Sequence, residues 1–217
     1  MWIAQIASCS AGRAIVASGH VSDPASARPA VSMEATRRRL TEKQADTVDR
    51  LTRAAMDVLS REGFAGLTVR MVAAQAGVGT ATAYTYFSSK EHLVAEMFWR
   101  RLAAMEPPAG DEPDSTARVL GVLRQIALLL ADEPALAGAV TAALLGTDPD
   151  VAHLRLRIGS EIRRRLIEAL GADADLELVE TLEMIYAGAL VRAGMGYASY
   201  AEIAERMERS ALRVLRH

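Results

Sequence analysis

The sequence has a single cysteine, Cys9, among its 217 residues. One thiol can form neither an internal disulfide nor a zinc site, which excludes disulfide-stapled secreted domains and zinc fingers. No apolar run is long enough to span a membrane, and the short apolar stretch before Cys9 lacks the basic residues of a signal peptide. We therefore expect a cytoplasmic protein with no membrane partner.

Aromatic side chains are also scarce, at 5% of a chain that is 51% apolar. Strands are enriched in aromatic and β-branched residues, whereas the abundant alanine and leucine of this chain are strong helix formers. The composition therefore predicts an all-α fold. The length suffices for one or two compact domains.

The motifs of common enzyme classes are missing as well. The chain has no glycine-rich phosphate loop and no nucleophile motif, and its four histidines (His20, His92, His153 and His217) lack the paired spacing of metal ligands. An enzyme is thus the least favoured class. We expect no catalytic residue, no metal and no cofactor.

The net charge of −2 does not by itself indicate a nucleic-acid-binding protein, but the charge is unevenly distributed along the chain. Residues 33–105 hold 11 Lys and Arg against 8 Asp and Glu, whereas residues 106–217 hold 12 against 18. A mildly basic first half on an acidic second half fits a DNA-reading domain joined to another domain.

The beginning of the chain differs in texture from the rest. Residues 1–32 are rich in Ala, Ser and Gly and carry few charges, which predicts a disordered leader. Because a charged, helix-like pattern begins at Met33, we hypothesise that translation starts there. The further segments that we expect are a basic N-terminal arm at 33–44, a first domain at 45–105, a proline-rich linker at 106–114 and a second helical domain at 115–217.

Helical periodicity runs through both domains. The first helix should span about 41–62, with Thr41 as its N-cap and Gly63 at its end. Thr68 should cap a short second helix, which ends in a sharp turn at Gly77. A third short helix should span about 80–86, with Ala83 and Phe87 facing inward. The remaining predicted helices run from near Ser89 to about Met105 and over about 115–132, 135–145, 151–170, 175–196 and 200–215.

The segment from Thr68 to Phe87 (TVRMVAAQAGVGTATAYTYF) is typical of a helix, a glycine turn and a second helix. Small alanines in the first helix allow the second to cross it closely, and the second presents several hydroxyl groups. Hydroxyls donate to phosphate oxygens and reach base edges in the major groove. The segment therefore predicts a motif that reads double-stranded DNA.

This segment and its flanks resemble the TetR family of bacterial transcription regulators. The resemblance implies an N-terminal three-helix helix-turn-helix domain, followed by a larger helical domain that binds a small-molecule effector and forms a homodimer. It also implies a ligand-responsive repressor on a palindromic operator. The matching residues are Gly63, Phe64, Thr68-Val69-Arg70, Val72-Ala73, Ala76-Gly77-Val78, Thr82, Tyr84, Phe87 and Ser89-Lys90-Glu91-His92-Leu93.

The resemblance also implies roles for single residues in DNA binding. Thr68 and Arg70 would contact phosphates from the start of the first motif helix, Tyr84 from the second, and Lys90 from the start of the next helix. The residues implied to face bases or nearby backbone are Thr80, Thr82, Thr85 and Tyr86.

The second motif helix departs from the family pattern because it contains no Arg or Lys. The common contact from arginine to guanine is therefore not available from this helix. The basic run of Arg37, Arg38 and Arg39, with Lys43, could supply the missing charge, since such arms enter the minor groove. The alternative is that these basic residues are simply exposed to solvent. The position of the basic run beside the motif favours DNA contact.

The second domain is predicted by analogy with the family fold. An apolar effector would bind among Met97, Trp99, Leu128, Leu145, His153, Tyr186 and Met195, although each is by default a core residue. Arg155, Arg157 and Arg163-Arg164-Arg165 could hold an anionic effector such as an acyl-coenzyme A, the alternative being a solvated helix face. The residues expected at the dimer interface are Gly188, Ala189, Gly194, Met195, Ile203, Met207, Ala211 and Val214.

Two other functions are alternatives to a DNA-binding regulator. A helical ligand-binding or scaffold dimer with a vestigial DNA domain would explain the uncharged second motif helix. Thr68, Arg70, Tyr84, Lys90 and the arginine arm argue against it. An enzyme lacks any supporting motif.

Overall fold

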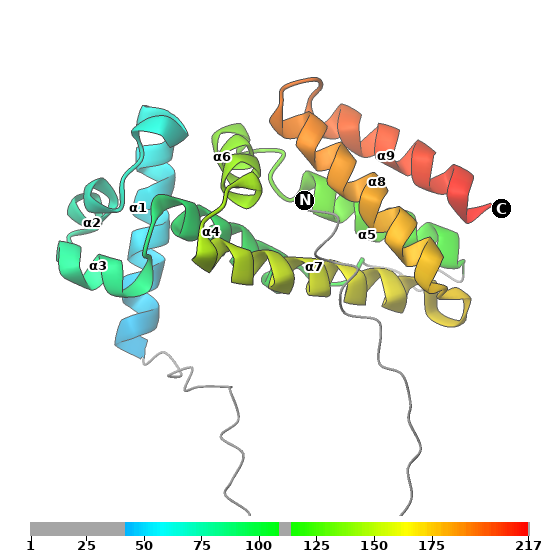
Figure 1. Cartoon of the computed structure of the whole chain (residues 1–217), viewed down its shortest axis with the longest axis horizontal. Helices are drawn as coiled ribbons and strands as arrows, with labels where there is room; N and C mark the ends of the chain where they lie inside the picture. Colours follow the sequence, from blue (N-terminus) through cyan, green and yellow to red (C-terminus); the bar gives the residue numbers. More distant parts are fainter. Residues whose placement is uncertain (1–41, 109–113, 217) are drawn as a thin grey trace, which may run out of the picture. The chain divides into compact units, whose positions relative to one another are not determined.

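The computed structural model describes residues 42–108 and 114–216, and every regular element in these two stretches is a helix (Figure 1). The all-α fold predicted from composition is confirmed. In chain order the elements are α1 (Glu42–Gly66), α2 (Val69–Ala76), α3 (Thr80–Tyr86), α4 (Lys90–Ala104), α5 (Ser115–Leu128), α6 (Pro134–Leu145), α7 (Pro149–Leu170), the 3-10 helix η3 (Gly171–Asp173), α8 (Leu176–Gly194) and α9 (Tyr200–Leu215).

The helix α1 changes direction at the glycine that the sequence marks as its end. The backbone of Gly63 leaves the helical region (φ 64°, ψ 176°), and one further short turn follows to Gly66. The predicted N-cap Thr41 lies outside the described residues. The apolar stripe of α1 faces the core, with Val48, Leu51, Ala55, Val58 and Leu59 buried.

The residues from Asp46 onward form one compact unit. Within it α4 packs against both α6 and α7, so this helix connects the three-helix motif to the later helices. The predicted division into residues 45–105 and 115–217 stays a prediction, because α4 contributes to the packing of both parts.

The later helices pack as neighbouring layers around a shared apolar core. In Figure 1, α8 and α9 run side by side, and α9 also packs against α5. Side-chain caps start α5, α7, α8 and α9. Asp114, Asp148, Asp175 and Ser199 each accept a hydrogen bond from a backbone N–H of the following turn, as good N-caps do.

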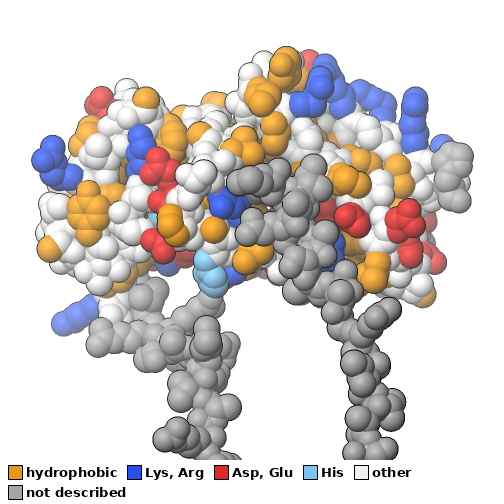
Figure 2. Space-filling view, viewed as in Figure 1, with side chains coloured by type: hydrophobic (Ala, Val, Ile, Leu, Met, Phe, Trp, Pro, Cys, Tyr) orange, Lys and Arg blue, Asp and Glu red, His pale blue; other side chains and the backbone are white. Residues whose placement is uncertain are grey.

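The apolar stripe of α9 corrects part of the predicted dimer interface. Ile203, Met207 and Ala211 are buried inside the chain, where α9 packs against α5 and α8. A residue buried within its own chain offers no surface to a partner. The outward face of α9 is charged instead, and Figure 2 shows Lys and Arg side chains along the edge that α9 forms.

Gly194 also serves packing within the chain. A Cβ atom on Gly194 would lie 2.6 Å from the Cβ of Thr141 and 2.3 Å from its Oγ1. Both distances are far inside van der Waals contact, so the missing side chain is what allows α6 to approach α8. Gly188 differs, because it is exposed and a Cβ there would meet open space.

Among the described residues, no helix combines the length and the apolar character needed to cross a bilayer.

Candidate nucleic-acid interface

The helix-turn-helix motif is built from a side-chain cap and a glycine turn. The hydroxyl oxygen of Thr68 accepts a hydrogen bond from the N–H of Met71 at 3.2 Å and so caps α2. Gly77 ends α2 in the left-handed region (φ 63°, ψ 34°), where glycine carries no steric penalty. Both features were predicted from the sequence. Because the Thr68 hydroxyl oxygen accepts in the cap, its proton can be donated to a second partner.

Arg50 of α1 fastens this turn. Its Nη2 donates to the carbonyl oxygens of Ala76 at 2.6 Å and Gly77 at 3.1 Å. These are carbonyls at the carboxyl end of α2, where a cation is favoured by the helix dipole. A residue that sequence reasoning did not single out therefore holds the turn between α2 and α3.

Lys90 has a second role besides the predicted phosphate contact. Its Nζ donates to the carbonyl oxygens of Phe64 at 3.0 Å and Ala65 at 3.2 Å, and it lies 4.8 Å from the centre of the Phe64 ring. The ammonium thus ties the start of α4 to the end of α1. Since an ammonium has three protons, one remains for a phosphate.

The side chains of α3 divide into an inner and an outer face. Ala83 is fully buried, and Phe87 follows it into the core, as predicted. Tyr86 is half-buried against the core and less open to DNA than expected. The exposed residues of α3 are Thr80, Ala81, Thr82, Tyr84 and Thr85.

Ala81 is the residue of this face that the sequence analysis missed. It lies one helical turn before Thr85, and both residues lie opposite the buried Ala83. Ala81 and Thr85 therefore form the centre of the outer face. The hydroxyl of Thr85 donates back to the carbonyl oxygen of Ala81 at 3.1 Å. Helical periodicity alone, counted from Ala83, would have identified Ala81.

The cations of the predicted interface are only partly described. Arg70 is exposed at the start of α2, and Lys43 is exposed on the first turn of α1. Arg37, Arg38 and Arg39 lie outside the described residues. Their contribution to DNA binding stays a prediction.

Comparison with known proteins agrees with this geometry. Residues 51–97 match the sequence model of the bacterial regulatory proteins of the tetR family. An uncharacterised HTH-type transcriptional regulator of Mycobacterium tuberculosis is 47% identical over 167 residues, covering 76% of this chain and 78% of that protein. The chain belongs to the TetR family.

A more distant regulator and a solved structure are also similar to this chain. The HTH-type transcriptional repressor KstR of Rhodococcus jostii is 24% identical over 165 residues, covering 73% of this chain and 78% of that protein. The crystal structure of a TetR regulator from Rhodococcus sp. RHA1 has a TM-score of 0.65 at 22% identity and covers 81% of this chain and 98% of the other. This TetR-family chain is accordingly a helix-turn-helix transcriptional regulator, as predicted, and its relatives are regulators rather than enzymes.

In this TetR-family chain, polar contacts join the end of the motif to the start of α7. The Ser88 hydroxyl donates to Asp150 at 2.5 Å and lies 3.1 Å from Nδ1 of His92. Burial would raise the pKa of the neighbouring Asp148 carboxyl, but hydrogen bonds from Ser89 and from the N–H groups of the α7 start outweigh it and lower that pKa. The loop after α3 is therefore tied to the start of α7.

The predicted effector residues do not gather in one cavity. Met97 and Tyr186 are buried in the core, where desolvation raises the pKa of the tyrosine, and Leu128 is half-buried. Leu145, His153 and Met195 are exposed. Trp99 alone among the seven lines one of the two hollows described next.

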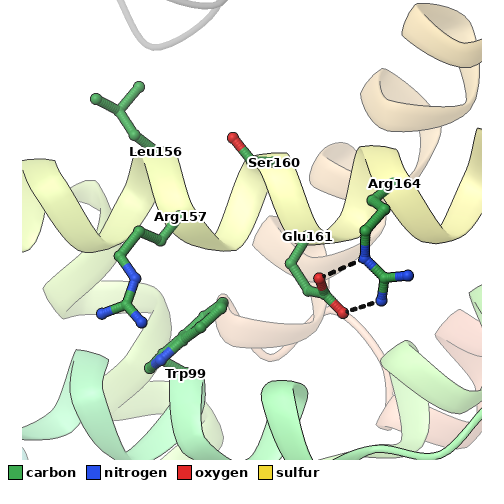
Figure 3. A pocket seen from close by; sticks show the side chains of 6 residues that line it. All are labelled: Trp99, Leu156, Arg157, Ser160, Glu161 and Arg164. Atoms are coloured by element: carbon green, nitrogen blue, oxygen red, sulfur yellow. Dashed lines mark hydrogen bonds and ion pairs between the residues drawn. The ribbon is translucent and has the colours of Figure 1, made fainter. Parts of the chain in front are cut away.

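The larger hollow is an open groove of about 350 Å³ between α4 and α7. In Figure 3 the guanidinium of Arg157 lies over the ring of Trp99, 4.2 Å from its centre. Glu161 and Arg164 pair beside them. The smaller hollow is an enclosed cavity of about 20 Å³, room for about one water molecule. Its lining is Phe98, Ile126, Ala127, Leu130, Ala137, Val140, Thr141, Leu190 and Tyr200.

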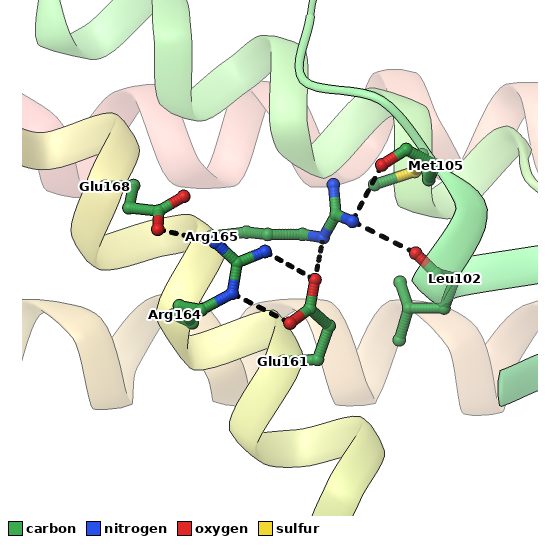
Figure 4. A network of polar contacts seen from close by, with 6 residues as sticks. All are labelled: Leu102, Met105, Glu161, Arg164, Arg165 and Glu168. Atoms are coloured by element: carbon green, nitrogen blue, oxygen red, sulfur yellow. Dashed lines mark hydrogen bonds and ion pairs between the residues drawn. The ribbon is translucent and has the colours of Figure 1, made fainter. Parts of the chain in front are cut away.

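The arginines predicted as possible ligands of an anionic effector form contacts with groups of their own chain. Arg165 is buried, and its guanidinium donates to the carbonyl oxygens of Leu102 and Met105 and to Glu161 (Figure 4). Hydrogen bonds from Arg164 and Arg165 lower the pKa of Glu161, although burial opposes them.

The other arginines of this group are likewise engaged. Arg155 caps the end of α6 at the carbonyls of Leu144 and Gly146, and Arg163 pairs with Glu183. These contacts brace α7, and the role of this arginine group toward an anionic effector stays a prediction.

Proposed function

We propose that this TetR-family regulator is a ligand-responsive repressor that binds a palindromic operator as a homodimer. The observation that carries the proposal is the ordered motif itself, in which α3 presents an exposed hydroxyl-rich face while Arg50 and Lys90 hold the neighbouring backbone. Two such helices in a dimer would enter successive major grooves. KstR, a repressor of the same family, supports the direction of regulation.

Each exposed residue has a proposed role on DNA. Thr68, Arg70 and Tyr84, together with the third proton of Lys90, would contact phosphates and set the register. Thr80, Thr82 and Thr85 would face bases or nearby backbone, with Tyr86 at the edge. The arm of Arg37, Arg38, Arg39 and Lys43 would enter the adjacent minor groove.

The proposed dimer surface is the exposed apolar side of α8. Leu176 is 70% exposed and Met184 48%, and both share one helix face with Gly188. Met195 and Tyr197 extend this surface past the end of α8 at 63% and 67% exposure. Exposed apolar groups in such a row favour burial against a partner. Ala189 and Val214, both half-buried, stay candidates.

Light scattering tests this surface. Met184→Glu places a charge in the proposed interface and should convert the dimer into a monomer. Leu156→Glu is the matched control, because Leu156 is equally apolar and 58% exposed but lies on α7. A dimer that survives Met184→Glu and dissociates with Leu156→Glu would move the interface to α7.

We place the effector in the enclosed cavity between α4, α5, α6, α8 and α9. Its lining is apolar apart from the hydroxyls of Thr141 and Tyr200, which suits an uncharged, largely apolar molecule. A molecule larger than water would have to part α6 from α8, where Gly194 and Thr141 are in close approach. The start of α7, which follows α6 directly, is bonded to Ser88, so such a shift would reach the end of α3.

The decisive test of the regulator is binding of the full chain to the DNA that flanks its own gene. Fluorescence anisotropy across a salt series should show affinity that falls steeply with salt, because phosphate contacts release counterions. Arg70→Gln combined with Tyr84→Phe should weaken binding and lower the salt slope. Arg209→Gln on α9 is the control, since it removes an equal charge from an exposed site remote from the motif. Equal loss in both proteins would refute the proposed interface.

A further inference from the structure

The centre of the outer face of α3 consists of two small side chains. Ala81 and Thr85 lie opposite the buried Ala83, and the more polar Thr82 and Tyr84 lie to either side. In a helix-turn-helix protein, the outward face of the second helix is the one that approaches base edges. The part of α3 that comes nearest the bases is therefore nearly apolar.

The hydroxyl of Thr85 adds little donor capacity to this centre. Its proton is used in the hydrogen bond to the Ala81 carbonyl at 3.1 Å. The side chain therefore presents its methyl group and an acceptor oxygen to the groove. No residue of α3 carries the guanidinium, ammonium or amide group that forms the common bidentate contacts with guanine or adenine.

The major groove offers one base group that matches such a surface. Thymine projects its C5 methyl group there, and alanine and the threonine methyl are among the side chains that contact it. Guanine, adenine and cytosine carry no such methyl group and present polar atoms at their major-groove edges, which an alanine cannot satisfy. Ala81 and Thr85 thus suit thymine better than any other base.

We propose that α3 reads its operator half-site through thymine methyl groups, which contact the methyl groups of Ala81 and Thr85. The inference rests on the proposed function, because it specifies how the DNA interface selects its sequence. It predicts A·T pairs, with thymine on the strand that faces α3, at the centre of each half-site.

Uracil substitution tests the inference directly. The full chain is first used to select duplexes from a random pool, and deoxyuridine then replaces each thymine of the selected half-site in turn. Deoxyuridine removes only the methyl group and leaves the minor groove unchanged, so A·T preferences that come from the basic arm or from groove width are not affected. We expect about fourfold weaker binding at one or two thymines per half-site.

Matched variants of Thr85 assign the contact. Thr85→Val keeps the methyl group and loses the hydroxyl, so the uracil effect should persist. Thr85→Ser keeps the hydroxyl and loses the methyl, so the uracil effect at one thymine should disappear. Tyr84→Phe should weaken binding to thymine and uracil duplexes equally. Since all these positions are exposed, the variants should fold.

The results separate the inference from the function on which it rests. Two results would overturn methyl readout while leaving a DNA-binding regulator intact. One is specific binding whose affinity is unchanged by every uracil substitution. The other is binding that is weakened by uracil in Thr85→Ser but not in Thr85→Val. Absence of any salt-sensitive binding by the unmodified chain would overturn the proposed function, and the inference with it.

Discussion

The ammonium of Lys90 lies 3.0 Å from the carbonyl oxygen of Phe64, so one side chain joins the first turn of α4 to the last turn of α1. The contact bridges 26 residues of sequence and joins the two segments that flank the helix-turn-helix motif. A residue that the family resemblance assigns to phosphate is therefore also part of the framework that positions α3.

Replacing Lys90 by methionine separates these two roles. Methionine keeps an apolar stem against Phe64 but donates no proton, so we expect the free energy of unfolding to fall by about 1–2 kcal/mol. If the third proton contacts phosphate, the salt slope of DNA binding should also fall by about one. Urea denaturation and anisotropy measure the two effects. A lower stability with an unchanged slope would show that Lys90 is structural only.

Arg50 provides a second test of positioning. Arg50→Gln should leave the two carbonyls at the end of α2 without their charged donor, costing about 1 kcal/mol of stability because the site is partly open to water. DNA affinity should fall for all sequences alike, since α3 loses its fixed orientation. Arg53→Gln, an exposed arginine on the same helix, is the control, and Arg50→Lys should restore part of the loss.

The residues of the motif differ in whether their structural roles can be predicted from the sequence. Thr68, Gly77 and Ser89 could be assigned from local patterns, because caps and glycine turns depend on a few adjacent residues. Arg50 and Lys90 could not, because their partners are 26 residues away and are backbone carbonyls that carry no sequence signal.

The dimer and effector residues were harder to predict for a related reason. The apolar stripe of α9 has the same pattern whether it faces a partner chain or the chain's own core, and the fold places Ile203 and Met207 in the core. Ala81 carries no polar group, so only its position around the helix marks it as part of the outer face. Pattern reveals that a face is apolar, whereas only tertiary packing decides what covers it.

Acid should destabilise the packing of α7 on α4 through Glu161. Its pKa in the folded protein is lowered from an ordinary value of 4.5, chiefly by hydrogen bonds from Arg164 and Arg165. A carboxyl with a lowered folded pKa stabilises the protein above its unfolded pKa, and this stabilisation is lost as the pH falls below that value through the folded pKa.

We therefore expect the free energy of unfolding to decline as the pH drops below about 4.5. Glu161→Gln should be less stable at neutral pH and should show a shallower decline. Denaturant titrations at several pH values measure both. Asp57→Asn, an exposed carboxyl of α1, is the control. Equal acid sensitivity in the wild type and in Glu161→Gln would exclude Glu161 as the source.

Gly194→Ala should be the most damaging glycine-to-alanine change among the glycines of the described helices. The new Cβ would overlap Thr141, whose Cβ, Oγ1 and Cγ2 would all lie within 2.6 Å of it. Relief requires α6 and α8 to separate, and overpacking of this kind costs about 1–3 kcal/mol. Gly159→Ala on α7, where nothing lies within 4 Å of the added atom, should instead be neutral or stabilising by about 0.5–1 kcal/mol.

A double-mutant cycle with Thr141→Gly identifies the cause. Thr141→Gly alone should cost roughly 0.3 kcal/mol through its helix propensity, and it removes every atom that the alanine meets. Gly194→Ala should therefore be much less harmful in the Thr141→Gly background, giving a coupling energy of about 1 kcal/mol or more by urea denaturation. Strictly additive losses would mean that the alanine is accommodated elsewhere and that α6 is not held against α8 by this contact. Because the proposed effector cavity lies between the same two helices, a confirmed coupling would also predict that Gly194→Ala changes the response of the regulator to its effector.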